Sequence, residues 1–428
     1  MRFAVTICCL ATVAVAHAQA LQQAPDSVTL TSLTLEEALR MAEAASPSLQ
    51  KARAELQALE ADIVESRSPL WNNPEISAEY ARRTTPNPGL PDERAREWAL
   101  GISQAFETGG QSKHRRAAAD SAKAAMDAQI EELRRQLRFE VQRGFLQVLS
   151  LQQRSALEEE AIRTVEQAAN AVKSRVAAGE DTRLDGNVAA VEVGRAHNQL
   201  ASLIDQLAQA RAEFADLLQM PPGQLPQVQG DLGRTATSTY RLIDLLESSR
   251  QRPQFEALAQ RERAARSRLA LERAAVSPDV TVGIGIAREG PGDTRERIKG
   301  INVSVPLPLF RRNAAAIGRA SSELTQVQIE RQAAEREARA SVIALWSRSE
   351  ALRARIEQIR SSIVAALDEN QRLSTRAYRE GELGLLELLV VTRQVLDGRR
   401  DLLEAQTEAA LTRTALEQAA GWADATRP

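Results

Sequence analysis

Residues 279–288 read DVTVGIGIAR, and this stretch decides the fold. Apolar side chains occupy every second position from Val280 to Ile286, and threonine or glycine fills the positions between them. A period of two predicts a β-strand with one apolar face. The same alternation of apolar with small or polar residues predicts three further strands, at about 75–83, 97–106 and 299–306.

The rest of the chain has the composition of a helical protein. It is rich in Ala, Leu, Glu, Gln and Arg, which are strong helix formers. Across 428 residues, 55 Lys and Arg nearly balance 57 Asp and Glu. This balance argues against a nucleic-acid partner, because general nucleic-acid binders need a basic excess. Aromatic residues make up only 3%, too few for stacking platforms or a large aromatic core.

The first residues predict an export signal. A positive Arg2 precedes a short apolar run and small residues suited to cleavage, so a signal peptide is expected at 1–18, with Ala20 as the alternative cleavage point. Cys8 and Cys9 lie inside this segment, so the mature chain is expected to carry no thiol. The run is too short to span a bilayer, and no later run of about 20 apolar residues predicts a transmembrane helix.

The chain repeats itself with a period of about 200 residues. The segment 33–56 parallels 240–263, with Pro47 and Pro253 at matching points, and the predicted strands match in the same order. The expected organisation is a first structural repeat (33–218), a connector rich in Pro, Gly and Thr (219–238) and a second structural repeat (239–421).

Each repeat is expected to hold a short helix, two strands, a very long helix, a tight turn and a return helix. Thr34 and Glu37 fit a capping box at the start of the first short helix. No proline interrupts the long helices, which would each be roughly 100 Å in length. Stripes of Ala and Leu favour coiled-coil packing, but a coiled-coil rod would not explain the strands. The long helices are expected at about 112–177 and 313–379, and the return helices at about 184–218 and 385–420.

The apolar face of the strands needs a cover. In a soluble antiparallel sheet, helices would cover it. Against this alternative, the hairpins are far apart in sequence and the strands have the length of tilted transmembrane strands. Because four strands cannot close a barrel and an open edge is forbidden in lipid, three chains are expected to share twelve strands. The expected lipid-facing residues are Ile76, Trp98, Leu100, Ile102, Val280, Val282, Ile284, Ile286, Ile301, Val303 and Val305.

With this arrangement of elements, the chain resembles TolC-like outer-membrane factors. The resemblance is carried by TLEEAL (34–39), NPEIS (73–77), the strand-to-helix junction SQAFETGGQSKHRRAAA (103–119), and the turns containing GEDTRLD and GELGLLEL. It covers essentially the whole mature chain, and the junction is most similar to the branch that serves cobalt–zinc–cadmium-type efflux pumps.

The resemblance implies a mainly α-helical protein with a membrane β-barrel. A homotrimer would form a twelve-stranded barrel in the outer membrane of a Gram-negative bacterium, continued by a periplasmic α-helical barrel. The resemblance also implies two partners. One is a periplasmic adaptor protein, and the other, reached through the adaptor, is an inner-membrane pump of the resistance–nodulation–division (RND) class. Some relatives carry a lipidated N-terminal Cys, which this chain lacks, so no lipid anchor is expected.

Two functional regions follow from the resemblance. The helix-to-helix turns at 175–187 and 376–388 would meet the adaptor, and glycines there suit a backbone with positive φ. An acidic constriction would lie near the periplasmic mouth, where three copies of Glu387 would repel one another, favour cations and raise each other's pKa. The alternatives are simple helix capping and an ordinary solvated carboxylate. The candidate adaptor contacts are Arg175, Gly179, Leu184, Asp185, Arg376, Gly381, Leu385 and Leu386.

No motif indicates catalysis, a cofactor or a metal site. His114 and His197 have no neighbouring Cys or His at ligand spacing. The favoured function is a passive exit duct for heavy-metal cations in a three-part efflux system. A duct for drugs or secreted proteins is the alternative within the same class, and a soluble periplasmic helical scaffold is the alternative from another class.

Overall fold

The computed structural model describes residues 29–180, 182–232, 240–290, 295–310, 312–380 and 382–422, so the expected signal peptide lies outside it. The chain divides into two compact units. The helical unit comprises Met1–Gln50, Leu133–Arg250 and Ala338–Pro428, and the sheet unit comprises Lys51–Glu132 and Gln251–Glu337.

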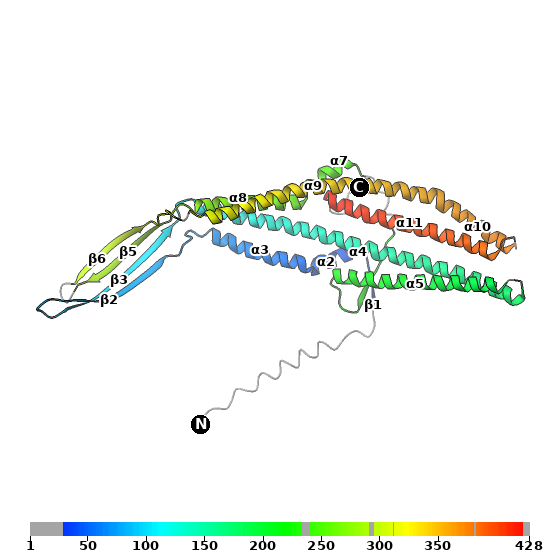
Figure 1. Cartoon of the computed structure of the whole chain (residues 1–428), viewed down its shortest axis with the longest axis horizontal. Coiled ribbons are helices and arrows are strands. Elements are labelled where there is room, and N and C mark those ends of the chain that lie inside the picture. The colour runs from blue at the N-terminus through cyan, green and yellow to red at the C-terminus, as the bar shows by residue number, and fades with distance from the viewer. Residues whose placement is uncertain are drawn as a thin grey trace, which may run out of the picture. The chain divides into compact units, whose positions relative to one another are not determined.

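The sheet unit contains one antiparallel sheet with the strand order β2-β3-β5-β6 (Figure 1). All four predicted strands are confirmed, and the pairing of β3 with β5 joins the two hairpins across the sequence. The strands β3 and β6 begin earlier than expected, because alternation continues through charged residues. The bounds are β2 (Glu75–Thr85), β3 (Glu93–Phe106), β5 (Val280–Glu289) and β6 (Glu296–Ser304), so Val305 lies just beyond its strand.

The expectation of one short helix at the start of each repeat was wrong, because each copy has two. The first copy has α2 (Leu35–Ala45) and α3 (Pro47–Ser66), and the second has α7 (Leu242–Ser249) and α8 (Pro253–Ala274). The two prolines cause the division. A proline lacks an N–H and clashes with the preceding turn, but it fits the first turn of a new helix.

The long helices lie close to their expected bounds. The first is α4 (Gln111–Ala178), followed by α5 (Arg183–Leu217). The second is α9 (Ala314–Gln358), which continues through a π-helical turn, η2 (Ile359–Val364), into α10 (Ala365–Arg379). The return helix is α11 (Leu385–Ala420). None of the helices in the described ranges has the length and hydrophobicity of a transmembrane span.

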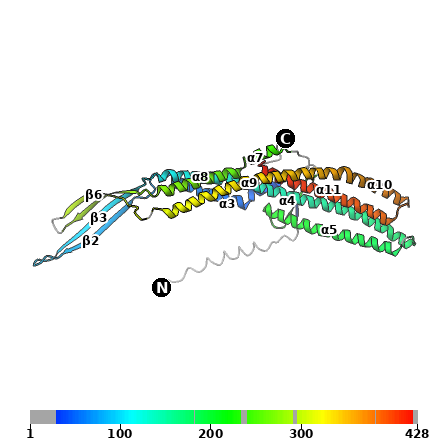
Figure 2. The same cartoon turned by 45° about the horizontal axis from the view of Figure 1, so that its top comes forward.

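In the helical unit the long and return helices pair side by side, α4 with α5 and α10 with α11 (Figure 2). Phe145 of α4 meets the edge of Phe214 of α5, with ring centroids 6.4 Å apart. A Cβ at Gly144 would come within 2.8 Å of the Phe214 ring, so the missing side chain lets the two helices approach closely. The capping box of α2 is also confirmed: Glu37 accepts a bond from the Thr34 N–H at 2.9 Å.

Two short strands, which the sequence did not predict, also belong to the helical unit. β1 (Thr29–Leu33) pairs in parallel with β4 (Gln224–Val228). The second of these lies within the segment expected to be a connector. The Gln152 side chain fastens β4 to α4, because it both accepts from the Val228 N–H (3.0 Å) and donates to the Val228 carbonyl (3.1 Å).

Candidate functional site

The apolar face of the sheet extends across all four strands. The register places Ile76, Ile102, Ile284 and Ile301 in one row, and directly opposed residues share a face. Their side chains are 81%, 45%, 57% and 77% exposed, so the described chain leaves this apolar band uncovered. An apolar surface of this extent marks contact with lipid or another protein.

The residues expected to face lipid fall on this side of the sheet. Within the strands they share the parity of the isoleucine row, and most are exposed. Val280 is only partly exposed, and Val305 lies beyond the end of β6. The strands therefore present one continuous apolar band, flanked by Tyr80 and Trp98 on the same face.

The opposite face has small side chains at the same height. Its row consists of Ser77, Gly101, Gly285 and Gly300. A Cβ at Gly101 would come within 2.7 Å of the Ser77 hydroxyl, so a larger residue at this position would require the Ser77 side chain to move, whereas a Cβ at Gly300 would meet open space. Glycine and serine leave this face small and compatible with water.

Toward the hairpin ends, the two faces carry opposite charge. This sorting was not predicted, although its signal is visible in ERAREW (93–98) and RERIK (295–299), where acids and bases alternate with the period of a strand. The apolar face carries Arg82, Arg94, Arg96, Arg288, Arg297 and Lys299, which we call the basic rows. The small-residue face carries Glu79, Glu93, Glu97, Glu289 and Glu296 toward the hairpin ends and Glu75 at the opposite end of β2, with Arg83 as the one cation of these strands on this side; we call it the acidic face.

The turn between α4 and α5 brings several predicted residues together. Gly179 has φ +77°, the left-handed conformation that glycine adopts without strain. The Glu180 N–H donates to the Arg175 carbonyl at 2.9 Å, which closes the end of α4. Leu184 is 70% exposed, so its side chain is available to a partner.

Asp185 is engaged as a helix cap in this turn. Its carboxylate accepts from the Thr182 hydroxyl at 2.6 Å and from the Thr182 N–H at 3.0 Å. In return the Asp185 N–H donates to the Thr182 hydroxyl at 3.2 Å. The hydrogen bonds from the Thr182 side chain and backbone lower the pKa of the Asp185 carboxyl.

The turn between α10 and α11 is described only in part. Gly381 and the side chains of Leu385 and Leu386 lie outside the described residues. Arg376 forms an ion pair with Glu380 at 2.9 Å. Glu387 is exposed, and its carboxylate accepts from the Gly384 N–H at 3.0 Å, so it caps α11 as Asp185 caps α5.

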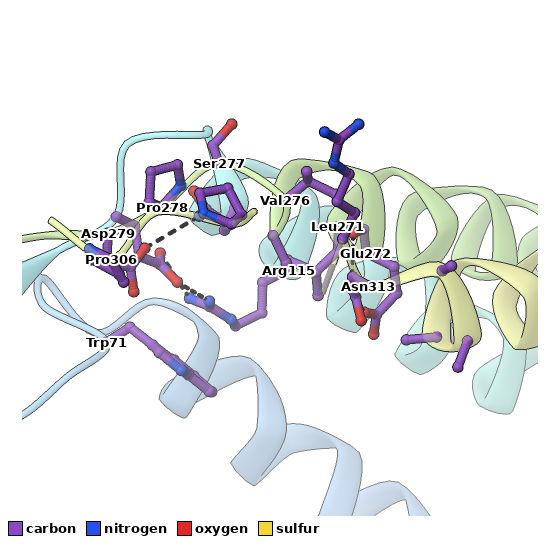
Figure 3. Close-up of a pocket in the computed structure, with 18 of the residues that line it drawn as sticks. Trp71, Arg115, Leu271, Glu272, Val276, Ser277, Pro278, Asp279, Pro306 and Asn313 are labelled. Carbon is purple, nitrogen blue, oxygen red and sulfur yellow. Dashed lines mark hydrogen bonds and ion pairs between the residues drawn. The ribbon is translucent and has the colours of Figure 1, made fainter. Parts of the chain in front are cut away.

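A pocket of about 1120 Å³ lies in the sheet unit where strands lead into helices (Figure 3). Arg115 of α4 lies over the Trp71 ring, 3.6 Å from its centroid, and pairs with Glu107. The carboxylate of Asp279 accepts from Gln111 at 3.4 Å. Three of these residues come from the junction motif at 103–119, so this motif fastens the sheet to the start of α4.

The second junction uses a different contact. Asn313 has φ +55°, and its amide donates to the carboxylate of Glu272 at 2.6 Å and to the Glu272 carbonyl at 3.0 Å. This ties the beginning of α9 to the end of α8. Within the described ranges, no three His, Cys, Asp or Glu side chains are grouped as metal ligands.

Comparison with known proteins gives a consistent result. The family described as "outer membrane efflux protein" matches residues 38–218 and 245–422. The cobalt-zinc-cadmium resistance protein CzcC of Cupriavidus metallidurans is 26% identical over 377 residues, covering 87% of this chain and 85% of that protein.

Solved structures share the fold. A membrane protein from Pseudomonas aeruginosa superposes with a TM-score of 0.74 at 20% identity, covering 90% of this chain and 92% of that one. CusC, whose structures were described in terms of transmembrane channel formation, gives a TM-score of 0.73 at 18% identity with the same coverage of 90% and 92%.

Proposed function

This chain belongs to the outer membrane efflux protein family, and from this premise we propose that it forms the exit duct of a metal-cation efflux system. Members of this family are transport ducts rather than enzymes, so the chain is an efflux channel component and has no catalytic role. Its location is then the outer membrane, with the helical unit extending into the periplasm.

The sheet supports an assembly of several copies. β2 and β6 are the edge strands of the four-stranded sheet, so each presents unpaired backbone groups. Such groups cannot remain unpaired in hydrocarbon, and four strands are too few for a barrel. Three copies, joined β2 to β6, would give a closed barrel of twelve strands. The long helices of the three copies would then form an α-helical barrel.

The acidic face is the observation that favours metal cations as the substrate. If the apolar face meets lipid, the acidic face lines the lumen, and three copies would place eighteen glutamates against three arginines there. A channel wall of one sign attracts ions of the other sign and raises their local concentration. A wall of this kind suits metal cations, and CzcC, by its name, is a cobalt-zinc-cadmium resistance protein.

The partners are a periplasmic adaptor and, through it, an inner-membrane RND pump. The exposed turn between α4 and α5, with Leu184 70% exposed, is suited to docking. Glu387 is assigned to the pore constriction, where its carboxylate would meet passing cations. The adaptor contacts are assigned to Arg175, Gly179, Leu184, Asp185, Arg376, Gly381, Leu385 and Leu386.

The test is the tolerance of a strain that lacks this chain. Loss of tolerance to zinc, cobalt or cadmium is expected, with unchanged tolerance to organic drugs, and the intact gene should restore it. Unchanged tolerance to all metals would refute the assignment. A loss confined to drugs would instead indicate a duct for organic compounds.

A further inference from the structure

The basic rows place like charges directly beside one another. Arg82 lies opposite Arg96, and Arg288 lies opposite Arg297, in the antiparallel register. Directly opposed side chains have Cβ atoms about 5 Å apart, and like charges at this distance destabilise a sheet. A surface that keeps such pairs needs negative charge from somewhere else.

The part of the chain that the structure describes does not supply that charge. Among the described residues, none of the six cations of the basic rows forms an ion pair. The neighbouring glutamates point to the other face because strand side chains alternate. Arg83 provides the contrast: it lies on the acidic face and pairs there with Glu97 at 3.2 Å.

The position of the basic rows relative to the apolar band indicates the source of the negative charge. On β3, Trp98 lies four residues from Ile102 toward the hairpin end, about 14 Å away, and Arg96 lies two residues farther, about 20 Å from Ile102. On the same face, Arg82 donates to the Tyr80 hydroxyl at 3.3 Å. The order along this face is therefore apolar, then aromatic, then basic. Aromatic residues mark the boundary between hydrocarbon and headgroups in membrane β-proteins.

Resting on the proposed function, in which the apolar face meets lipid, we propose that the basic rows bind the phosphate groups of an outer-leaflet glycolipid. Arginine guanidinium groups form paired hydrogen bonds with phosphate oxygens, which lysine cannot match. The basic rows lie at the hairpin ends, away from the ends that lead into α4 and α9. If the helices are periplasmic, the hairpin ends reach the outer leaflet, where the phosphorylated glycolipid is lipopolysaccharide.

Binding of purified lipopolysaccharide to the full chain in detergent tests this assignment. The variants are Arg82→Gln and Arg96→Gln, singly and together, and Arg83→Gln is the matched control on the acidic face. Each substitution in the basic rows is expected to weaken binding about fivefold. The control should bind like the wild type. Arg82→Lys and Arg96→Lys keep the charge and should recover part of the affinity.

Removing the phosphates from the glycolipid should abolish the difference between wild type and variants. The assignment is overturned if the double variant binds like the wild type, if Arg83→Gln weakens binding equally, or if millimolar inorganic phosphate displaces the lipid. Bilayer conductance of the same variants separates the two proposals. Normal conductance with unselective lipid binding refutes only the lipid site, whereas a chain that does not insert into bilayers refutes the channel as well.

Discussion

The N-cap residue of each return helix determines how many hydrogen bonds a nearby acidic side chain accepts. Asp185 and Glu387 occupy the same position, the third residue after the N-cap of α5 and of α11. In the first turn the cap is Thr182, whose N–H and hydroxyl both donate to Asp185. In the second turn the cap is Gly384, which has only its N–H to donate, at 3.0 Å. The Glu387 carboxylate therefore keeps more capacity to bind a cation, which suits the pore constriction proposed for it.

This difference predicts unequal effects of two neutral substitutions. Glu387→Gln is expected to lower the cation-over-anion permeability of the channel by about two- to fivefold, because a unit charge contributes about 1 kcal/mol to an ion 4 Å away in water. Asp185→Asn is the matched control and should change the ratio little. Reversal potentials in planar bilayers under a salt gradient measure it. An equal fall in both variants, or no fall in Glu387→Gln, would remove Glu387 from the pore.

At the scale of elements, short sequence patterns correctly predicted which segments form strands and which form helices. The alternation in β5 and the proline-free runs of α4 and α9 gave correct element types, because strand and helix periods are properties of short windows. The division at Pro47 and Pro253 was also readable, since proline starts helices more easily than it continues them. We used these prolines only as evidence of the internal repeat and expected one short helix in each copy.

Other features depend on partners that are distant in sequence. The strands β1 and β4 each have five residues and pair across nearly 200 positions, so neither has a distinctive pattern alone. No sequence pattern predicted the π-helical turn η2. The helix that follows it, α10, packs closely against α11. A Cβ at Gly398 of α11 would come within 2.4 Å of Leu367, so the helices are in close contact beside this turn. The charge sorting of the sheet required the register to be known.

One such distant contact gives a prediction for the helical unit. Glu158 of α4 is 1% exposed, and Arg400 of α11 binds it with two hydrogen bonds, one of 2.6 Å. The hydrogen bonds with Glu158 raise the pKa of Arg400. Arg400→Met leaves a buried, uncompensated carboxylate and is expected to cost about 3 kcal/mol, at the low end for buried pairs because Arg400 is 30% exposed.

The loss should appear as a lower thermal midpoint of the helical circular dichroism signal. The double variant Glu158→Met with Arg400→Met is the control. It removes both charges and should recover most of the midpoint, because a buried ion pair contributes little relative to apolar packing. Equal midpoints for the single and double variants would mean that the pair does not tie α4 to α11.

At the scale of the whole molecule, a single register explains several properties of the sheet. Because side chains alternate along each strand, the two faces differ in both hydrophobicity and charge. One face has the apolar band and a basic end, and the other has small side chains and an acidic end. β2 and β6 are edge strands, so the four strands of one copy do not form a closed barrel by themselves. In the proposed closed assembly of three copies, the two faces of the sheet would become the outside and the lumen of a duct.

This assignment of faces predicts which charges the permeating ions experience. Replacing Glu79, Glu289 and Glu296 by Gln removes half of the acidic face and should reduce cation selectivity in planar bilayers at least as much as Glu387→Gln does, since fixed charges on a channel wall set the local ion concentration. The effect should diminish in high salt, which screens charges beyond about 3 Å at 1 M. Arg82→Gln with Arg96→Gln removes two of the six cations of the basic rows on the other face and should leave selectivity unchanged. If only this second variant alters selectivity, the basic face lines the lumen and the assignment of faces is reversed.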